Sequence, residues 1–148
     1  MRIMRALTLW QPWATLMAEG HKKNETRSWP TNVRGPVAIH SAKKPFKEVR
    51  SLIDPRSIEA ISNLVYPYTL DKLPTGYVLG AGNLKDCKRI DEEFLETLDP
   101  TERLLGDYTL GRYAWLFEDV KHFKIPILAK GLQGFWNWEV PDGIEVIL

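Results

Sequence analysis

The sequence predicts an α+β protein in which a small, mostly antiparallel β-barrel is flanked by short helices. Strand-like segments outnumber helical ones late in the 148-residue chain, and the steady strand–helix–strand alternation that is typical of parallel sheets does not occur. The predicted strands are short, and closing them into a barrel would remove their exposed edges. The length of the chain fits a single domain over residues 1–148.

The first third of the chain predicts a strand, a short helix and two more strands. Small or polar residues alternate with leucines over residues 5–10, which predicts a strand. Apolar residues then follow Pro12 with helical spacing up to a stop at Gly20, so a helix of about two turns is expected. Residues 25–29 and 36–42 predict two further strands, with turn-forming residues between them.

The middle of the chain predicts helical structure over residues 44–65 with an interruption at Pro55. A residue that precedes proline is disfavoured in a helix, so Asp54 marks the place where a second helix begins. Residues 66–76 are rich in proline, tyrosine and turn-forming residues, and they predict a loop.

The remaining elements are mostly strands. A strand is expected over residues 77–90, where small residues such as Gly80 predict a bend or the close approach of another segment. The acidic residues 91–105 predict one or two short surface helices. Alternating aromatic residues over 111–120 predict a strand, and residues 121–140 predict two short strands around a glycine-rich turn.

The composition is that of an ordinary globular chain, with 44% hydrophobic and 26% charged residues. The one cysteine, Cys87, excludes an internal disulfide and a cysteine-based zinc site, and the three histidines lack ligand spacing, so no metal or cofactor is expected. No apolar run approaches the roughly 20 residues that cross a bilayer, so no membrane partner is expected. The N-terminus lacks the features of a signal peptide, and a cytoplasmic location follows as the expectation.

The net charge of +1 conceals a separation of charge along the chain. Residues 20–50 carry eight basic and two acidic side chains, whereas residues 86–107 carry eight acidic and three basic ones. The first segment predicts a face that suits a polyanion, and the acidic segment 86–107 offers a surface for a protein partner. Two ordinary solvated surfaces would give the same composition. The oligomeric state is left open.

The stretch GHKKNETRSWP, residues 20–30, carries the most distinctive pattern. In a strand, Glu25, Arg27 and Trp29 would share one face, although two charges and a large aromatic ring make neither a core nor an ordinary solvent face. Arg27 offers a planar fork for a phosphate or a base edge, and Glu25 would orient it. A surface ion pair worth about 0.2–1 kcal/mol, beside a solvated Lys22, is the alternative.

The same stretch contains Gly20, Lys22, Glu25 and Arg27 in the spacing Gly-x-Lys-x-x-Glu-x-Arg. With the later segments RGPVAIHSAK, GYVLGAGNLKDC, GRYAWLFEDV and KGLQGFWNW in the same order, the chain resembles the ASCH (activating-signal-cointegrator homology) family over nearly its whole length. The resemblance implies a PUA-like fold, a cleft lined by the motif residues and an association with RNA. It also implies two alternatives, because some members are amidohydrolases of acetylated cytidine and others are described as ribonucleases.

Aromatic rings beside cationic groups are what single-stranded nucleic acid requires, because bases stack and phosphates pair. We therefore predict a module that binds single-stranded RNA or a nucleotide. Its candidate binding residues are Trp10, Gln11, Lys22, Arg27, Trp29, His40, Lys43, Lys44, Lys130 and Gln133.

A small hydrolase that acts on RNA or on a modified nucleoside is the alternative, with Lys22 and Glu25 as the candidate catalytic residues. The amidohydrolase branch of the family pairs its lysine with a threonine three residues later, whereas this chain has Glu25 there. Thr26 is adjacent but would point to the opposite face of the strand. Whether the protein is an enzyme is therefore left open.

Overall fold

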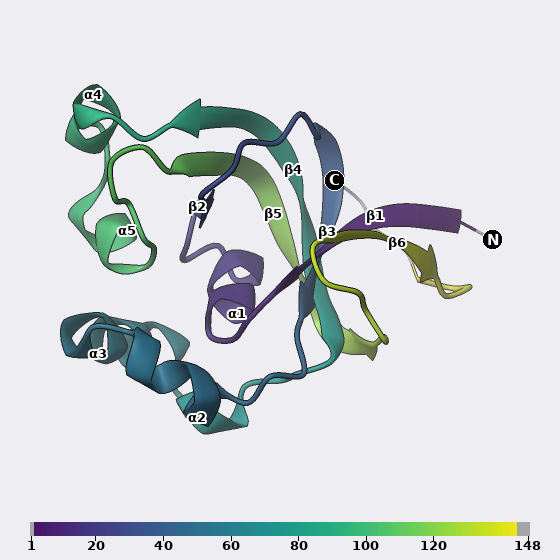
Figure 1. Ribbon diagram of the computed structural model, residues 1–148. Coiled ribbons are helices and arrows are strands. Elements are labelled where there is room, and N and C mark those ends of the chain that lie inside the picture. Colours follow the sequence, from purple (N-terminus) through teal and green to yellow (C-terminus); the bar gives the residue numbers. More distant parts are fainter. Residues whose placement is uncertain (1, 145–148) are drawn as a thin grey trace.

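The computed structural model describes residues 2–144, in which six strands form one mixed sheet (Figure 1). The strands are β1 (Arg2–Leu9), β2 (Asn24–Arg27), β3 (Gly35–Ser41), β4 (Tyr77–Arg89), β5 (Tyr113–Leu128) and β6 (Phe135–Val140). Their order across the sheet is β2-β5-β4-β3-β1-β6. The strands β1 and β3 run parallel and all other neighbours run antiparallel, so the sheet is mostly antiparallel, as predicted.

The predicted closed barrel is wrong, because over residues 2–144 the sheet stays open with β2 and β6 at its edges. The helix α1 (Trp13–Ala18) lies within the curve of the sheet (Figure 1), and its Ala14 and Met17 are fully buried in the main core. Six strands that wrap a helix are too few to close around it. Instead, the rings of Trp115 in β5 and Phe135 in β6 stack with centroids 5.5 Å apart, so side chains bridge the opening.

The start of α1 is held by Gln11. The side-chain amide of Gln11 donates to Thr15 Oγ1 and to the carbonyl oxygen of Pro74, both at 2.7 Å, and its Oε1 accepts from the Thr15 backbone N–H at 3.0 Å. The helix ends as predicted near Gly20, whose φ of 78° suits a residue without a Cβ. A short helix with both ends fixed in this way can present neighbouring side chains to a site.

The helical region after β3 is interrupted where the sequence predicted it. It comprises α2 (Phe46–Val49), the 3₁₀ turn η1 (Arg50–Leu52) and α3 (Pro55–Val65), and a further turn, η2 (Leu70–Lys72), follows. The Asp54 side chain accepts from the backbone N–H of Arg56 and caps α3. Two α3 residues, Ile61 and Val65, are buried with Leu16 of α1, so α3 covers the side of α1 that faces away from the sheet.

The strand β5 has 16 residues, whereas the sequence predicted a break after residue 120. The strand bends there instead of ending, because Asp119 adopts a φ of 52° and the pairing with β4 shifts register at three places. A Cβ at Gly80 would collide with the carbonyl oxygen of Lys121, which confirms the predicted close approach. The following strand, β6, pairs with β1 and not with the end of β5.

The acidic segment forms two short helices, α4 (Glu92–Glu96) and α5 (Pro100–Leu104), as predicted. Their first turns are capped by the side chains of Asp91 and Asp99. Most of the acidic side chains are exposed, but Glu102 of α5 is buried. Within the described part of the chain, no helix has both the length and the apolar character to cross a bilayer.

Candidate functional site

A cleft of about 1000 Å³ opens between the helical region, the β1–α1 connection and the segments that precede β5 and β6. Its residues fall into two groups. The β2 side consists of Lys22, Glu25, Thr26, Arg27, Gly106, Asp107 and Arg112. The β3 side consists of His40, Lys43, Lys44, Glu48 and residues 129–134, with Thr8 and Trp10 next to them.

On the β2 side, β2 places Glu25 and Arg27 on the same face, as the alternation predicted. The Nε and Nη2 atoms of Arg27 each lie 3.0 Å from Glu25 Oε2. The guanidinium carbon of Arg27 is also 5.6 Å from the ring centroids of Trp29 and of Trp115. The position of Arg27 is therefore set by a charge-assisted contact and by two aromatic rings.

Lys22 is the most deeply buried charged group of the site, with a relative exposure of 1%. It donates a short hydrogen bond to the carbonyl oxygen of Asn24, and its Nζ lies 4.0 Å from Glu102 Oε2. The pKa of Lys22 is lowered because burial removes water from the ammonium group, and the carboxylates of Glu25 and Glu102 oppose this shift. The alternative of a solvated surface lysine is therefore wrong.

Glu102 is a site residue that the sequence did not indicate. Besides its contact with Lys22, it accepts from the Lys23 backbone N–H at 2.6 Å and from the Tyr108 hydroxyl at 2.8 Å. Burial and the adjacent Glu102 carboxylate raise the pKa of Tyr108. A Cβ at Gly106 would lie only 3.2 Å from Lys22 Nζ, so a side chain at this position would crowd the ammonium group at the edge of the cleft.

The β3 side carries lysines that lack an acidic partner within residues 2–144, namely Lys43, Lys44 and Lys130. The ammonium group of Lys44 lies 4.6 Å from the ring centroid of Trp10, a side chain with 43% exposure. The segments that carry the lysines are tied to one glycine: Gly76 N–H donates to the Ser41 carbonyl at 2.7 Å, and Ala129 N–H donates to the Gly76 carbonyl at 3.1 Å. The three lysines therefore border the cleft from two segments that are both hydrogen-bonded to Gly76.

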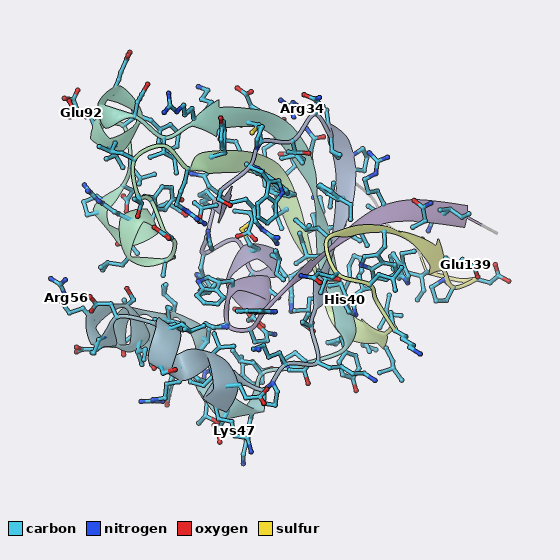
Figure 2. All side chains as sticks on the ribbon, viewed as in Figure 1. Arg34, His40, Lys47, Arg56, Glu92 and Glu139 are labelled. Atoms are coloured by element: carbon cyan, nitrogen blue, oxygen red, sulfur yellow. The ribbon has the colours of Figure 1, made fainter. Side chains whose placement is uncertain are left out.

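His40 is buried beneath residues 129–134 and labelled in Figure 2. Its Nε2 lies 2.8 Å from the carbonyl oxygen of Ala129, so this nitrogen carries a hydrogen, and its Nδ1 lies 3.0 Å from Thr8 Oγ1. The Thr8 hydroxyl also lies 2.7 Å from the Leu132 carbonyl oxygen and accepts from Trp136 Nε1 at 2.8 Å. Burial lowers the pKa of His40, which favours the neutral ring. Nδ1 and the Leu132 carbonyl then compete for the single hydroxyl hydrogen of Thr8.

The structure brings most of the predicted residues together and leaves two apart. The cleft is lined by Trp10, Lys22, Glu25, Arg27, His40, Lys43, Lys44, Lys130 and Gln133. Gln11 does not line it, because its side chain holds α1. Trp29 does not line it either, because β2 ends at Arg27, so the predicted strand over residues 25–29 is too long.

The predicted single basic face over residues 20–50 is wrong. Lys22 is buried, and the exposed Arg34 and Lys47 lie at opposite ends of the molecule in Figure 2. Arg34 also has an acidic neighbour, since its Nη2 is 3.9 Å from Asp86 Oδ1. A strand alternates the direction of its side chains and a helix distributes them around its axis, so a run of charges in sequence does not make one surface.

Sequence reasoning missed several cleft residues because they are uncharged or distant in sequence. Gly106 and Thr8 act through the space or the hydroxyl that they provide, and no local pattern marks this. The sequence indicated the glycine-rich turn at Gly131 but not its contact with His40. A Cβ at Gly131 would lie 2.6 Å from His40 Nδ1, so this glycine lets residues 129–134 cover the ring. Among residues 2–144, no group of three or more His, Cys, Asp or Glu side chains has the arrangement of a metal site.

Comparisons with known proteins show the same family and fold. Activating signal cointegrator 1 of Homo sapiens and of Mus musculus are 37% and 34% identical to the chain over 93 residues. The match covers 60% of this chain but only 16% of either cointegrator, so the chain spans a small part of these relatives. The crystal structure of ASCH from Zymomonas mobilis has a TM-score of 0.56 and 15% identity, covering 92% of this chain and 87% of that one.

The crystal structure of a mutant of the Zymomonas mobilis protein gives a similar result, with a TM-score of 0.55, 15% identity, and coverage of 92% of this chain and 88% of that one. At these identities the two structures show a shared fold and nothing about activity. The family model described as the ASCH domain matches residues 7–128, which is most of the chain. The chain therefore belongs to the ASCH domain family.

Proposed function

We propose that this ASCH domain binds RNA or a nucleotide in the cleft. The observation that carries the proposal is the group of Lys43, Lys44 and Lys130, which have no acidic partner within residues 2–144, next to the exposed ring of Trp10. Ammonium groups pair with phosphates and an aromatic face stacks on a base, and proteins combine the two to bind single-stranded nucleic acid. The general association of the family with RNA agrees with this function.

The contact between Lys44 and Trp10 supports the proposal further. An ammonium group 4.6 Å above an indole ring is held near one position, although it remains accessible at the edge of the cleft. A ligand whose phosphate contacts Lys44 would therefore bring its base or sugar close to Trp10. Because this lysine is already held near one position, binding costs less side-chain entropy.

The test is the binding of a fluorescent single-stranded RNA of about ten nucleotides between about 50 and 200 mM salt. We expect affinity to fall as salt rises, and Lys44→Ala to weaken binding by about 5- to 10-fold. Lys47→Ala is the matched control, since Lys47 is exposed on α2, does not line the cleft and projects outward in Figure 2, and this variant should bind like the parent. Absence of binding, or equal losses in both variants, would contradict the proposal.

Hydrolysis of RNA or of a modified nucleoside is a second candidate, and one observation favours it. Thr26, which strand alternation placed on the face opposite Glu25, lines the cleft together with Lys22. Lys22 Nζ and the Thr26 methyl carbon lie 3.2 and 3.6 Å from the Cβ position that Gly106 lacks, so the two residues are neighbours there. A lysine whose pKa is lowered by burial is a better base towards a hydroxyl than an ordinary lysine. Product formation from RNA or from N-acylated nucleosides would support this candidate if Thr26→Val abolished it and Thr69→Val, at an exposed position outside the cleft, did not.

A further inference from the structure

The two sides of the cleft differ in how much positive charge they leave for a ligand. On the β2 side, each cationic group already contacts an acidic one: Arg27 meets Glu25 at 3.0 Å, and Arg112 Nε is 3.4 Å from Asp107 Oδ2. The buried Lys22 has Glu102 at 4.0 Å. A phosphate on this side would have to displace or face these carboxylates, which costs free energy.

The β2 side nevertheless offers good partners for a neutral polar group. The Glu25 carboxylate accepts hydrogen bonds, Arg27 keeps the Nη1 nitrogen that does not contact Glu25, and Gly106 leaves space next to Lys22. The edge of a nucleobase presents donors and acceptors side by side, and carboxylates and guanidinium groups are among the side chains that recognise such edges.

The β3 side has the opposite balance. Its three lysines lie on segments joined through Gly76, and the only carboxylate among its lining residues, Glu48, is exposed and has no ion pair with them in the described chain. Ammonium groups that line one side of a cleft without internal partners suit a phosphate, and a monoester phosphate, with up to two negative charges, suits them better than a diester with one.

We propose that the cleft takes a single nucleotide with a terminal phosphate monoester, with the phosphate against Lys43, Lys44 and Lys130 and the base on the β2 side. This inference rests on the proposed function and names its ligand class. The ligand is either a free mononucleotide or the phosphorylated end of a strand. A strand that ran through the cleft would place its next phosphate near Glu25 and Asp107, which the charge distribution opposes.

Calorimetric titration of the unmodified protein tests the inference with five kinds of probe. These are the ribonucleoside 5′- and 3′-monophosphates, the matching nucleosides, and a single-stranded RNA of about eight nucleotides with and without a 5′-phosphate. We expect one of the mononucleotides to bind within about 3-fold of the phosphorylated RNA, and its nucleoside to bind at least about 10-fold more weakly. For the RNA probes, the slope of log K against log salt should be near −0.7, the value for about one phosphate of a single strand.

The outcomes separate the two levels of the proposal, and a mononucleotide that binds while the phosphorylated RNA does not would identify a free nucleotide as the ligand. Equal binding of the mononucleotide and the phosphorylated RNA, with weaker unphosphorylated RNA, supports a terminal phosphate. Much tighter binding of both RNAs, with a slope of about −2 or steeper, overturns the inference and leaves the proposed function standing. Equal binding of nucleoside and nucleotide overturns the phosphate position, and no binding of any probe overturns the proposed function.

Asp107→Asn provides an independent check on the excluding role of the β2 side. Removing this carboxylate should strengthen the binding of the longer RNA by about 2- to 5-fold, which is more than it changes the binding of the mononucleotide. Asp71→Asn, in η2 and outside the cleft, is the control and should change neither. A variant that weakens the longer RNA, or leaves it unaltered, contradicts the inference.

Discussion

The two sides of the cleft use the same kinds of side chain in opposite ways. On the β2 side, cationic groups are partly or fully buried and contact carboxylates of the protein, as Lys22 does with Glu102 and Arg27 with Glu25. On the β3 side, Lys43 and Lys130 are exposed and have no such partner within residues 2–144. A cationic residue in a cleft is therefore not in itself a ligand contact. Its internal partner decides whether the residue serves stability or binding.

The largest effect that tests this comparison is expected for Lys22→Met. The substitution leaves the Glu102 carboxylate buried without its counter-charge, and breaking a buried pair in this way costs about 3–5 kcal/mol of unfolding free energy. Urea denaturation measures it. The double variant Lys22→Met/Glu102→Gln removes both charges and should recover more than half of the lost free energy of unfolding. If the single variant is as stable as the parent, Lys22 does not stabilise the β2 side.

A smaller loss of stability, about 1–2 kcal/mol, is expected for Arg27→Lys. Lysine cannot place two N–H groups on Glu25 Oε2 or lie flat beside Trp29 and Trp115. Thermal unfolding should therefore show a lower midpoint. The control is Arg34→Lys, because the contact of Arg34 with Asp86 is exposed to solvent, where an ion pair contributes little, and this variant should unfold almost like the parent. If Arg27→Lys unfolds like the parent but binds the nucleotide more weakly, Arg27 is a ligand-binding residue like the lysines of the β3 side.

Trp10→Leu should act on binding and not on stability. Loss of one stacked base is worth about 1–3 kcal/mol of binding free energy, while an exposed side chain changes unfolding by about 0.5 kcal/mol or less. Trp29→Leu is matched to it, because Trp29 is also exposed but does not line the cleft. Nucleotide titration and thermal unfolding of both variants test this difference. Equal losses of affinity would show that the two tryptophans do not differ in their role in binding.

The smallest effect is a shallow dependence of stability on pH. Burial lowers the pKa of His40, so the unfolded chain binds a proton at this residue before the folded protein does. Stability is thus full above the ordinary histidine pKa of about 6.5 and falls as pH decreases through that value, by no more than about 1.4 kcal/mol per pH unit. His40→Gln should flatten this slope below neutral pH, and His122→Gln, at an exposed histidine, should retain it.

The sequence predicted what depends on neighbouring residues. The end of α1 at Gly20, the interruption at Pro55 and the shared face of Glu25 and Arg27 follow from local spacing, and all are present. The open sheet could not be predicted in this way, because it depends on α1 filling the curve of strands that are distant in sequence.

The same limit applied to the site. Glu102 bonds the backbone of Lys23 across 79 residues, so the pattern of the acidic segment could not separate this inward carboxylate from its exposed neighbours. The sequence also could not predict that the β3 lysines lack acidic partners within residues 2–144, because this depends on where the acidic groups lie in space. Residue type identified the candidates, and only three-dimensional contacts divided them into two roles.

The stack of Trp115 on Phe135 has a consequence for motion. Arg27 lies against Trp115, and Gly134 of the β3 side directly precedes Phe135, so the two walls of the cleft meet at this contact. Parallel rings can slide over one another without breaking backbone hydrogen bonds between strands. The width of the cleft can therefore change at a low cost in free energy. Amide hydrogens on the outer edges of β2 and β6 should exchange with solvent faster than those of β3 and β4, and a ligand that joins the walls should slow them together.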